Sequence, residues 1–432
     1  MSGTEAEGRS GAGFAPARSR LVPLIVSAAI LLAGNGLLVT LISVRARAEG
    51  FGDGYIGLLG TVYYLGFLGG VLLTPMLIRR AGHIRVFAAL AATSATTILV
   101  MVLWIDPLAW ALARVAGGFA FCGCLVVIES WLNEAADNTD RGRVLSVYRV
   151  VDLSANTLGQ FLLPVIGIAG FQIFVVAGIF FCVALIPVSL SSQSSPKPPG
   201  SDRADFGLVW AVSPAAAATC VTLGLTNGAF RTVGPVYAQE IGLGIEDLAL
   251  FISLFIIGGA VLQYPLGQLS DRFDRRRVII AVTIAAALAG FLLAQAEDRV
   301  MVLAGAFLFG GFALPLYSLA SAHANDFAKP GQSVDLAAGL FLFFTAGAVL
   351  GPVIASQIMA WFGPSAFFLY TSLLHLSLVA FVVIRMLSRA PVPRDERKRA
   401  VWLLRTSPLF NRLVASGREE RGGPEQADKD RD

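Results

Sequence analysis

Long apolar runs alternate along the chain with short polar connections. A bilayer core about 30 Å thick is crossed by roughly 20 helical residues, and twelve runs reach about this length. They lie at 21–44, 55–78, 84–105, 108–132, 146–168, 171–190, 213–237, 248–269, 278–296, 300–322, 335–360 and 364–386. Strands of an outer-membrane barrel would instead alternate apolar and polar residues. The pattern therefore predicts an all-α membrane protein with twelve transmembrane helices.

The composition excludes several other classes of protein. Hydrophobic residues make up 56% of the chain and charged residues 14%, whereas an average soluble domain carries about 25% charged residues. The mean hydropathy of +0.71 rules out an ordinary soluble enzyme or a disordered chain. The four cysteines lie in apolar runs without zinc-type spacing, so we expect no metal site. Without a nucleotide-binding P-loop or a hydrolase motif, we expect no cofactor, no ATP-driven pump and no enzyme.

Polar segments divide the chain into two similar halves. Residues 1–20, rich in Gly, Ser and Arg, predict a disordered tail, and the Pro- and Ser-rich segment 191–207 predicts a linker. We therefore expect six-helix bundles at 21–190 and 208–386. The basic tail at 387–432 is expected to attract anionic lipid; nucleic-acid binding is not expected.

The distribution of Lys and Arg predicts the orientation. Connections on one side of the expected membrane hold only Arg45, Arg47 and Arg299, and the segments on the other side hold most of the remaining cations. Because cytoplasmic loops carry an excess of Lys and Arg, we expect both termini in the cytoplasm.

The two halves repeat with an offset of 192 residues. Asn35 then corresponds to Asn227, and Gly159 corresponds to Gly351. Each half contains an even number of runs, so both halves enter the membrane from the same side and are related by an axis along the membrane normal. This arrangement is typical of transporters in which two bundles rock about a site near the middle of the bilayer.

A loop and several span motifs carry a resemblance to a known family. The segment after the eighth run resembles the loop signature G-x-x-x-D-R-x-G-R-R of the major facilitator superfamily. Its matching positions are Gly267, Asp271, Arg272, Arg275 and Arg276. A degenerate copy after the second run keeps Gly82 and Arg85, and Gly351-Pro352 resembles the Gly-Pro motif of the superfamily. The string from Glu129 to Asn133, followed by Arg141-Gly142-Arg143, is similar to the bacterial YcaD-like branch.

The resemblance implies the major facilitator fold, with two pseudo-symmetric six-helix bundles around a central cavity. It also implies that the loop aspartate clamps helix ends across the two halves and favours the outward-open state. Only Asp271 can do so here, because Arg79 occupies the equivalent position in the first copy. The fifth run has Gly159-Gln160 instead of Gly-Pro, which weakens the interpretation as an antiporter.

Ionisable residues inside the runs are the candidate functional groups, since each costs at least about 2.5 kcal/mol to insert. Arg114 and Arg231, with Asn35 and Asn227, are predicted to bind substrate, because arginine presents forked donors to a carboxylate or phosphate. The alternatives are that the arginines bond backbone carbonyls or extend to the interface, and that the asparagines bond between helices. Arg114 could equally serve proton coupling, the role that the family motif implies.

Glu129, Arg149 and Asp152 form a second candidate group near the cytoplasmic ends of the fourth and fifth runs. Arg149 and Asp152, three residues apart, share a helix face. The group is predicted to transfer protons or gate the cavity. The alternative is a structural ion pair that anchors the turn between the two helices.

Together these features predict a monomeric, proton-coupled secondary transporter in the bacterial inner membrane. It would move a small organic solute, with an anion as the favoured class, by alternating access. Drug or metabolite efflux by antiport is an alternative within the same class. A transport-inactive membrane sensor or scaffold is an alternative of another class.

Overall fold

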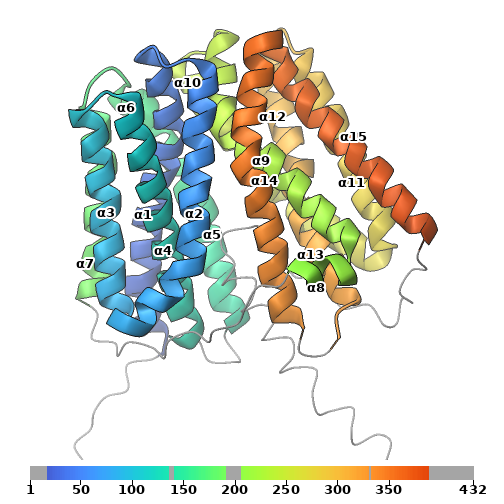
Figure 1. The fold of residues 1–432 in the computed structure, drawn as a ribbon, viewed down its shortest axis with the longest axis horizontal. Helices are drawn as coiled ribbons and strands as arrows, with labels where there is room; N and C mark the ends of the chain where they lie inside the picture. Colours follow the sequence, from blue (N-terminus) through green and yellow to red (C-terminus); the bar gives the residue numbers. More distant parts are fainter. Residues whose placement is uncertain (1–16, 136–140, 191–205, 330–331, 389–432) are drawn as a thin grey trace, which may run out of the picture.

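The computed structural model of the chain describes residues 17–135, 141–190, 206–329 and 332–388 (Figure 1). The predicted amino-terminal tail, linker and basic tail lie almost entirely outside these ranges, and so do residues 136–140 between the fourth and fifth runs.

The described part of the chain consists of helices and contains no strand. The first half comprises α1 (Ala17–Ala48), α2 (Asp53–Ala81), α3 (His83–Leu103), α4 (Pro107–Ala135), α5 (Arg141–Gln160), α6 (Leu162–Ile166) and α7 (Gln172–Ser189). The second half comprises α8 (Phe206–Val212), α9 (Pro214–Glu240), α10 (Ile245–Arg272), α11 (Arg275–Ala294), α12 (Arg299–Ala313), α13 (Leu316–Asp326), α14 (Ser333–Phe362) and α15 (Ser365–Ser388).

Two predicted spans are each broken into two helices, and proline accounts for both breaks. Pro164 lacks an N–H and its ring clashes with the carbonyl group four residues earlier; that residue is Gln160, where α5 ends. Pro315 likewise separates α12 from α13. In each case the second helix continues the crossing that the first helix begins (Figure 1).

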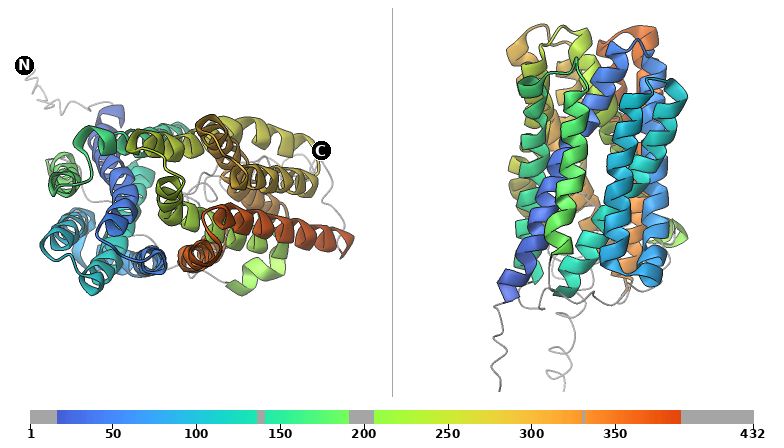
Figure 2. Two further views of the ribbon diagram at one scale, coloured as in Figure 1. Left: turned by 90° about the horizontal axis from the view of Figure 1, so that it is seen from above. Right: turned by 90° about the vertical axis from the view of Figure 1, so that its left-hand side faces the viewer.

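Two of the twelve predicted crossings are more polar than the others. Ten segments of the described chain are long and apolar enough to span a membrane, with α12 and α13 counted together. The two further crossings are α5, continued by α6, and α9. They pack against α1 and α14 respectively and run alongside the apolar helices (Figures 1 and 2). Their polar side chains are the starting point for the functional site.

The helices form two groups, α1–α7 and α9–α15 (Figures 1 and 2). We call the end where α1 begins and α15 ends the terminal side, and the opposite end the far side. The two groups approach each other at the far side and diverge toward the terminal side (Figure 1). Buried residues of both groups together form one hydrophobic cluster.

Equivalent close contacts in the two halves show the internal repeat. Gly159 of α5 packs on the backbone of Ala33 in α1, and Gly351 of α14 packs on the backbone of Leu225 in α9. Both residues of the second pair lie 192 positions after those of the first. A Cβ atom at either glycine would overlap the neighbouring carbonyl oxygen, so these helices approach as closely as small residues allow.

Candidate functional site

A cavity with an empty volume of about 890 Å³, open solvent included, lies between the two halves. The first half contributes polar side chains to its wall from α1 and α5: Thr40, Arg149, Asp152, Asn156 and Gln160. In the second half, α9 contributes Asn227 and Arg231. The remaining wall of the second half comes from α10, from the α12–α13 break and from α14: Ile252, Phe255, Ile256, Leu314, Tyr317 and Phe344.

The charged groups on α5 are bonded to one another. The Nη1 atom of Arg149 donates to Oδ2 of Asp152 at 2.7 Å, and Nδ2 of Asn156 donates to Oδ1 of Asp152 at 2.8 Å. The three residues follow at i, i+3 and i+7, so they lie along one face of the helix. The side chains of Arg149 and Asp152 are only 11% and 8% exposed. Asp152 thus has a cation on one oxygen and an amide on the other.

A second set of bonds connects α5 to α1 on the same wall. The Oγ1 atom of Thr40 donates to Oε1 of Gln160 at 2.7 Å, and Nε2 of Gln160 donates to the carbonyl oxygen of Gly36 at 2.6 Å. Gln160 belongs to the Gly159-Gln160 pair that the fifth run has instead of a Gly-Pro motif. Its side chain connects the two helices through these bonds. These polar groups on α1 and α5 are therefore occupied by each other.

Arg231 on α9 has a different environment. It is half-buried in the cavity wall and makes no hydrogen bond or ion pair with any residue that the structure describes. Its charge acts electrostatically on Asp152 across the cavity and on Tyr63 of α2. Asn227, one turn earlier on α9, lines the same wall, and its Oδ1 atom is buried without a hydrogen-bond partner in the described chain. Within the described part of the chain, the cavity thus contains an unpaired guanidinium group.

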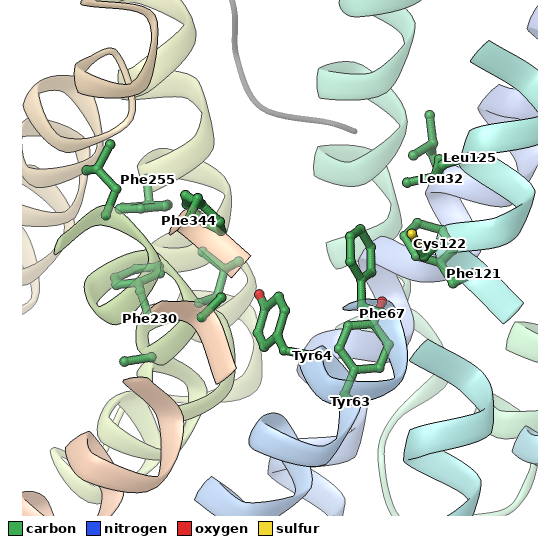
Figure 3. Close-up of a cluster of buried hydrophobic side chains, with 14 of the residues drawn as sticks. Leu32, Tyr63, Tyr64, Phe67, Phe121, Cys122, Leu125, Phe230, Phe255 and Phe344 are labelled. Atoms are coloured by element: carbon green, nitrogen blue, oxygen red, sulfur yellow. The ribbon is translucent and has the colours of Figure 1, made fainter. Parts of the chain in front are cut away.

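Arg114 and Asn35 lie behind the cavity wall, in the first half. Neither is among the described residues that line the cavity. The guanidinium carbon of Arg114 lies 4.0 Å from the centre of the Tyr63 ring, a cation–π arrangement. The Tyr63 hydroxyl group donates to Oδ1 of Asn35 at 3.3 Å. Tyr63 therefore contacts both of these predicted substrate-binding residues, and Figure 3 shows it with Phe67 in the aromatic cluster of the first half.

Glu129 also lies away from the cavity. It is fully buried on α4 and accepts a hydrogen bond of 3.2 Å from the hydroxyl group of Tyr148 on α5. Tyr148 directly precedes Arg149 in the sequence. Of the predicted proton-coupling group, Arg149 and Asp152 line the cavity, and Glu129 is not among the described lining residues but acts electrostatically on Arg149.

The loop signature joins three helices of the second half. The Nε atom of Arg275 donates to Oδ2 of Asp326 at 2.7 Å, and its Nη1 atom lies 3.2 Å from Oδ1 of Asp271. Arg276 pairs with Asp274, whose side chain caps the start of α11. The side chains of Arg272 and Arg85, two further residues of the motif copies, are exposed on the terminal side. The contact of Asp271 with Arg275 lies within one half, so a clamp between the halves stays a prediction.

The first copy of the signature ends in a sharp turn. Gly82 has a φ of +82°, which a side chain would strain, and it joins α2 directly to α3. Pro352 of the Gly-Pro motif lies at the interface between the halves, where it faces Gly60 of α2.

The far side carries a contact that sequence reasoning missed. The Nη1 atom of Arg47 lies 3.0 Å from Oδ1 of Asp53 and 2.8 Å from Oε1 of Glu240, which belongs to the other half. Nearby, Oγ1 of Thr61 on α2 donates to the carbonyl oxygen of Val349 on α14 at 2.7 Å. The internal repeat could have indicated this contact, because Arg47 and Glu240 lie near equivalent ends of the first helices of the two halves.

Comparison with known proteins supports this architecture. The profile of the Major Facilitator Superfamily matches residues 24–254 and 215–418. An uncharacterized MFS-type transporter from Enterobacter sp. (strain 638) is 25% identical over 377 residues, which cover 86% of this chain and 96% of the relative. The uncharacterized MFS-type transporter YcaD of Escherichia fergusonii is 24% identical over 374 residues, with the same coverage of both chains.

Solved structures show the same fold. The nucleoside transporter NupG superposes with a TM-score of 0.73 at 12% identity, covering 86% of this chain and 99% of NupG. A bacterial homologue of the human lysosomal transporter Spinster, in an inward-facing and occupied conformation, gives 0.70 at 14% identity, covering 89% and 99%. The predicted fold of two six-helix bundles and the resemblance read from the sequence motifs are both confirmed. By the extent of the profile match, the chain belongs to the major facilitator superfamily and is a multi-pass membrane transporter.

Proposed function

We propose that this transporter moves a small organic anion across the bacterial inner membrane by alternating access of the cavity between its halves. The observation that carries the proposal is Arg231 in the cavity wall, which has no hydrogen-bond or ion-pair partner among the described residues. Among the described lining residues, Arg149 and Arg231 are cations and Asp152 is the one carboxylate, so the cavity has an excess of one positive charge.

An unpaired cation within a membrane protein is costly because the surroundings solvate it poorly. An anion that enters the cavity relieves this cost, and the planar guanidinium group can hold it through two parallel hydrogen bonds. Arg231 therefore supplies affinity for the anionic group. Asn227, one turn away, is placed to bond an adjacent polar atom of the solute.

Asp152 is the proposed proton site. When its carboxylate is protonated, the ion pair with Arg149 weakens, and Arg149 becomes available to the solute as a second donor across the cavity from Arg231. A proton and an anion then favour each other's binding, and this linkage is reciprocal. Positive linkage is what a symporter needs. In the alternative, efflux by antiport, cargo and proton would have to compete.

The closed far side corresponds to one state of the cycle. The positive-inside pattern supports a cytoplasmic terminal side, and with this orientation the closed far side is the external side and the proposed state is inward-facing. Opening the far side requires the contacts of Arg47 with Glu240 and of α2 with α14 to break. Binding of proton and solute can drive this change only through different affinities for the two states.

The test is thermal unfolding of the purified chain with a panel of monocarboxylates and phosphate monoesters. We expect members of the panel to raise the unfolding temperature of the wild type, and Arg231→Gln to weaken their binding at least tenfold. Arg299→Gln is the matched control, because Arg299 is paired with Asp247 and more than half exposed, away from the cavity. Equal stabilisation of wild type and Arg231→Gln would remove the anion proposal. Ligand binding without flux in proteoliposomes would favour the sensor alternative.

A further inference from the structure

We infer that the solute is an amphipathic monoanion, with one acid group and a mainly apolar body, and that polyhydroxylated solutes such as sugars and sugar acids are excluded. The inference rests on the proposed function and specifies its substrate class. It comes from the uneven distribution of polar groups between the two walls of the cavity.

The wall opposite the polar face is apolar except for Tyr317 of α13. It is formed by α10, by Leu314 at the α12–α13 break and by Phe344 of α14. Phe255 of α10 stacks on Phe230 with ring centroids 3.8 Å apart, and Figure 3 shows both rings in the aromatic cluster of the second half. A ring held in such a cluster presents a fixed apolar surface. The body of a bound solute therefore meets side chains that offer almost no hydrogen bonds.

The polar wall cannot satisfy a hydroxyl-rich body either. Thr40, Gln160 and Gly36 bond one another, and Asn156 bonds Asp152. A sugar hydroxyl group that meets these residues would give up its bonds to water and find groups that already bond one another, which is unfavourable. An apolar body has no such bonds to lose and gains from leaving water.

The free polar groups of the cavity are concentrated on one turn of α9. Arg231 and Asn227 are four residues apart and share a helix face. They fix the position of the acid group, and the apolar residues of α10 then receive the body. While Asp152 is ionised, the described lining has an excess of one positive charge, which a monoanion balances and a dianion exceeds.

The test is calorimetric binding of straight-chain carboxylates from butyrate to octanoate, and of gluconate, to the full chain in nanodiscs. Burial of each added methylene is expected to tighten binding by roughly fourfold until the apolar wall is covered. Gluconate is expected to bind at least 100-fold more weakly than hexanoate, which has the same number of carbon atoms. Arg231→Gln should weaken every member of the series, which separates binding in the cavity from adsorption to the lipid.

A pair of variants on α10 locates the body of the solute. Ile256 lines the cavity, whereas its neighbour Ile257 is 38% exposed and does not. We expect Ile256→Ala to weaken octanoate binding about tenfold with little effect on butyrate, and Ile257→Ala to change neither.

The outcomes separate the inference from the proposed function. If gluconate bound as tightly as hexanoate and both depended on Arg231, the inference would be overturned and the anion transporter would stand. If affinity did not increase with chain length, or if Ile256→Ala and Ile257→Ala behaved alike, the assigned position of the body would be wrong. If carboxylates bound wild type and Arg231→Gln equally, or bound neither, both proposals would fail.

Discussion

A single methyl group at Gly57 should prevent the far side from closing. Gly57 of α2 packs against Ser356 and Pro352 of α14, in the other half. A Cβ atom at this position would overlap Oγ of Ser356 and lie 2.6 Å from the carbonyl oxygen of Pro352. The serine hydroxyl group can rotate away, but the carbonyl oxygen belongs to the helix backbone. The two halves must therefore separate.

The expected size of the effect follows from this overlap. Ordinary contacts of a Cβ atom begin at 3.4 Å, so the shortfall to the Pro352 oxygen is 3.4 − 2.6, or about 0.8 Å. Overpacking of this kind costs about 1–3 kcal/mol, and 1.4 kcal/mol is a factor of ten in an equilibrium. Because the contact exists only when the far side is closed, Gly57→Ala should lower the ratio of far-closed to far-open molecules by about 5- to 150-fold.

The assay measures labelling of a cysteine at Val39 in the cavity by a membrane-impermeant maleimide added from the far side, with the exposed Cys182 replaced by serine. Gly57→Ala should accelerate this labelling. Gly66→Ala is the matched control, because Gly66 packs on the backbone of Val115 within the same half. The control should lower thermal stability without a selective gain in far-side labelling. Unchanged labelling in a folded Gly57→Ala protein would refute the assignment of this contact as the far-side closure.

Three further variants test other parts of the account. Arg47→Gln should also increase far-side labelling, but by less than about fivefold. The side chains of Arg47 and Glu240 are 34% and 16% exposed, and such ion pairs contribute up to about 1 kcal/mol. Unchanged labelling would exclude a gating role for this pair. The affinity of the wild type for carboxylates should rise as the pH falls, because protonated Asp152 releases Arg149. In Asp152→Asn this affinity should not depend on pH, and calorimetry at two pH values measures the difference. Asp326→Asn should destabilise the fold by about 3–5 kcal/mol, because Arg275, which is 2% exposed, loses a buried ion-pair partner. The control Asp247→Asn, in the exposed pair with Arg299, should cost about 1 kcal/mol or less. Equal losses of thermal stability in the two variants would contradict the assigned difference between the buried and the exposed pair.

The fold could be predicted because the bilayer sets the length of each crossing and the chain repeats itself. The interruptions of two spans, at Phe161 and before Pro315, were not predicted. The length of an apolar run gives no information on where a proline removes a backbone hydrogen bond. The prolines that cause them were visible in the sequence, so a closer local analysis would have found both.

The candidate site could be predicted only in part. Arg149, Asp152, Asn227 and Arg231 lie together in the cavity because the helices that carry them are too polar to face lipid. Arg114 was predicted to bind substrate together with Arg231, but it lies against the ring of Tyr63, a packing detail that no spacing rule supplies.

The most direct test of the central claim is counterflow of hexanesulfonate in proteoliposomes. This probe carries a permanent negative charge on an apolar body, so it does not leak across the bilayer as a protonated acid does. We predict that wild-type protein exchanges labelled for unlabelled probe and that Arg231→Gln, reconstituted at the same density, does not. Exchange by Arg231→Gln at the wild-type rate would contradict the claim that this arginine holds the solute between the two halves.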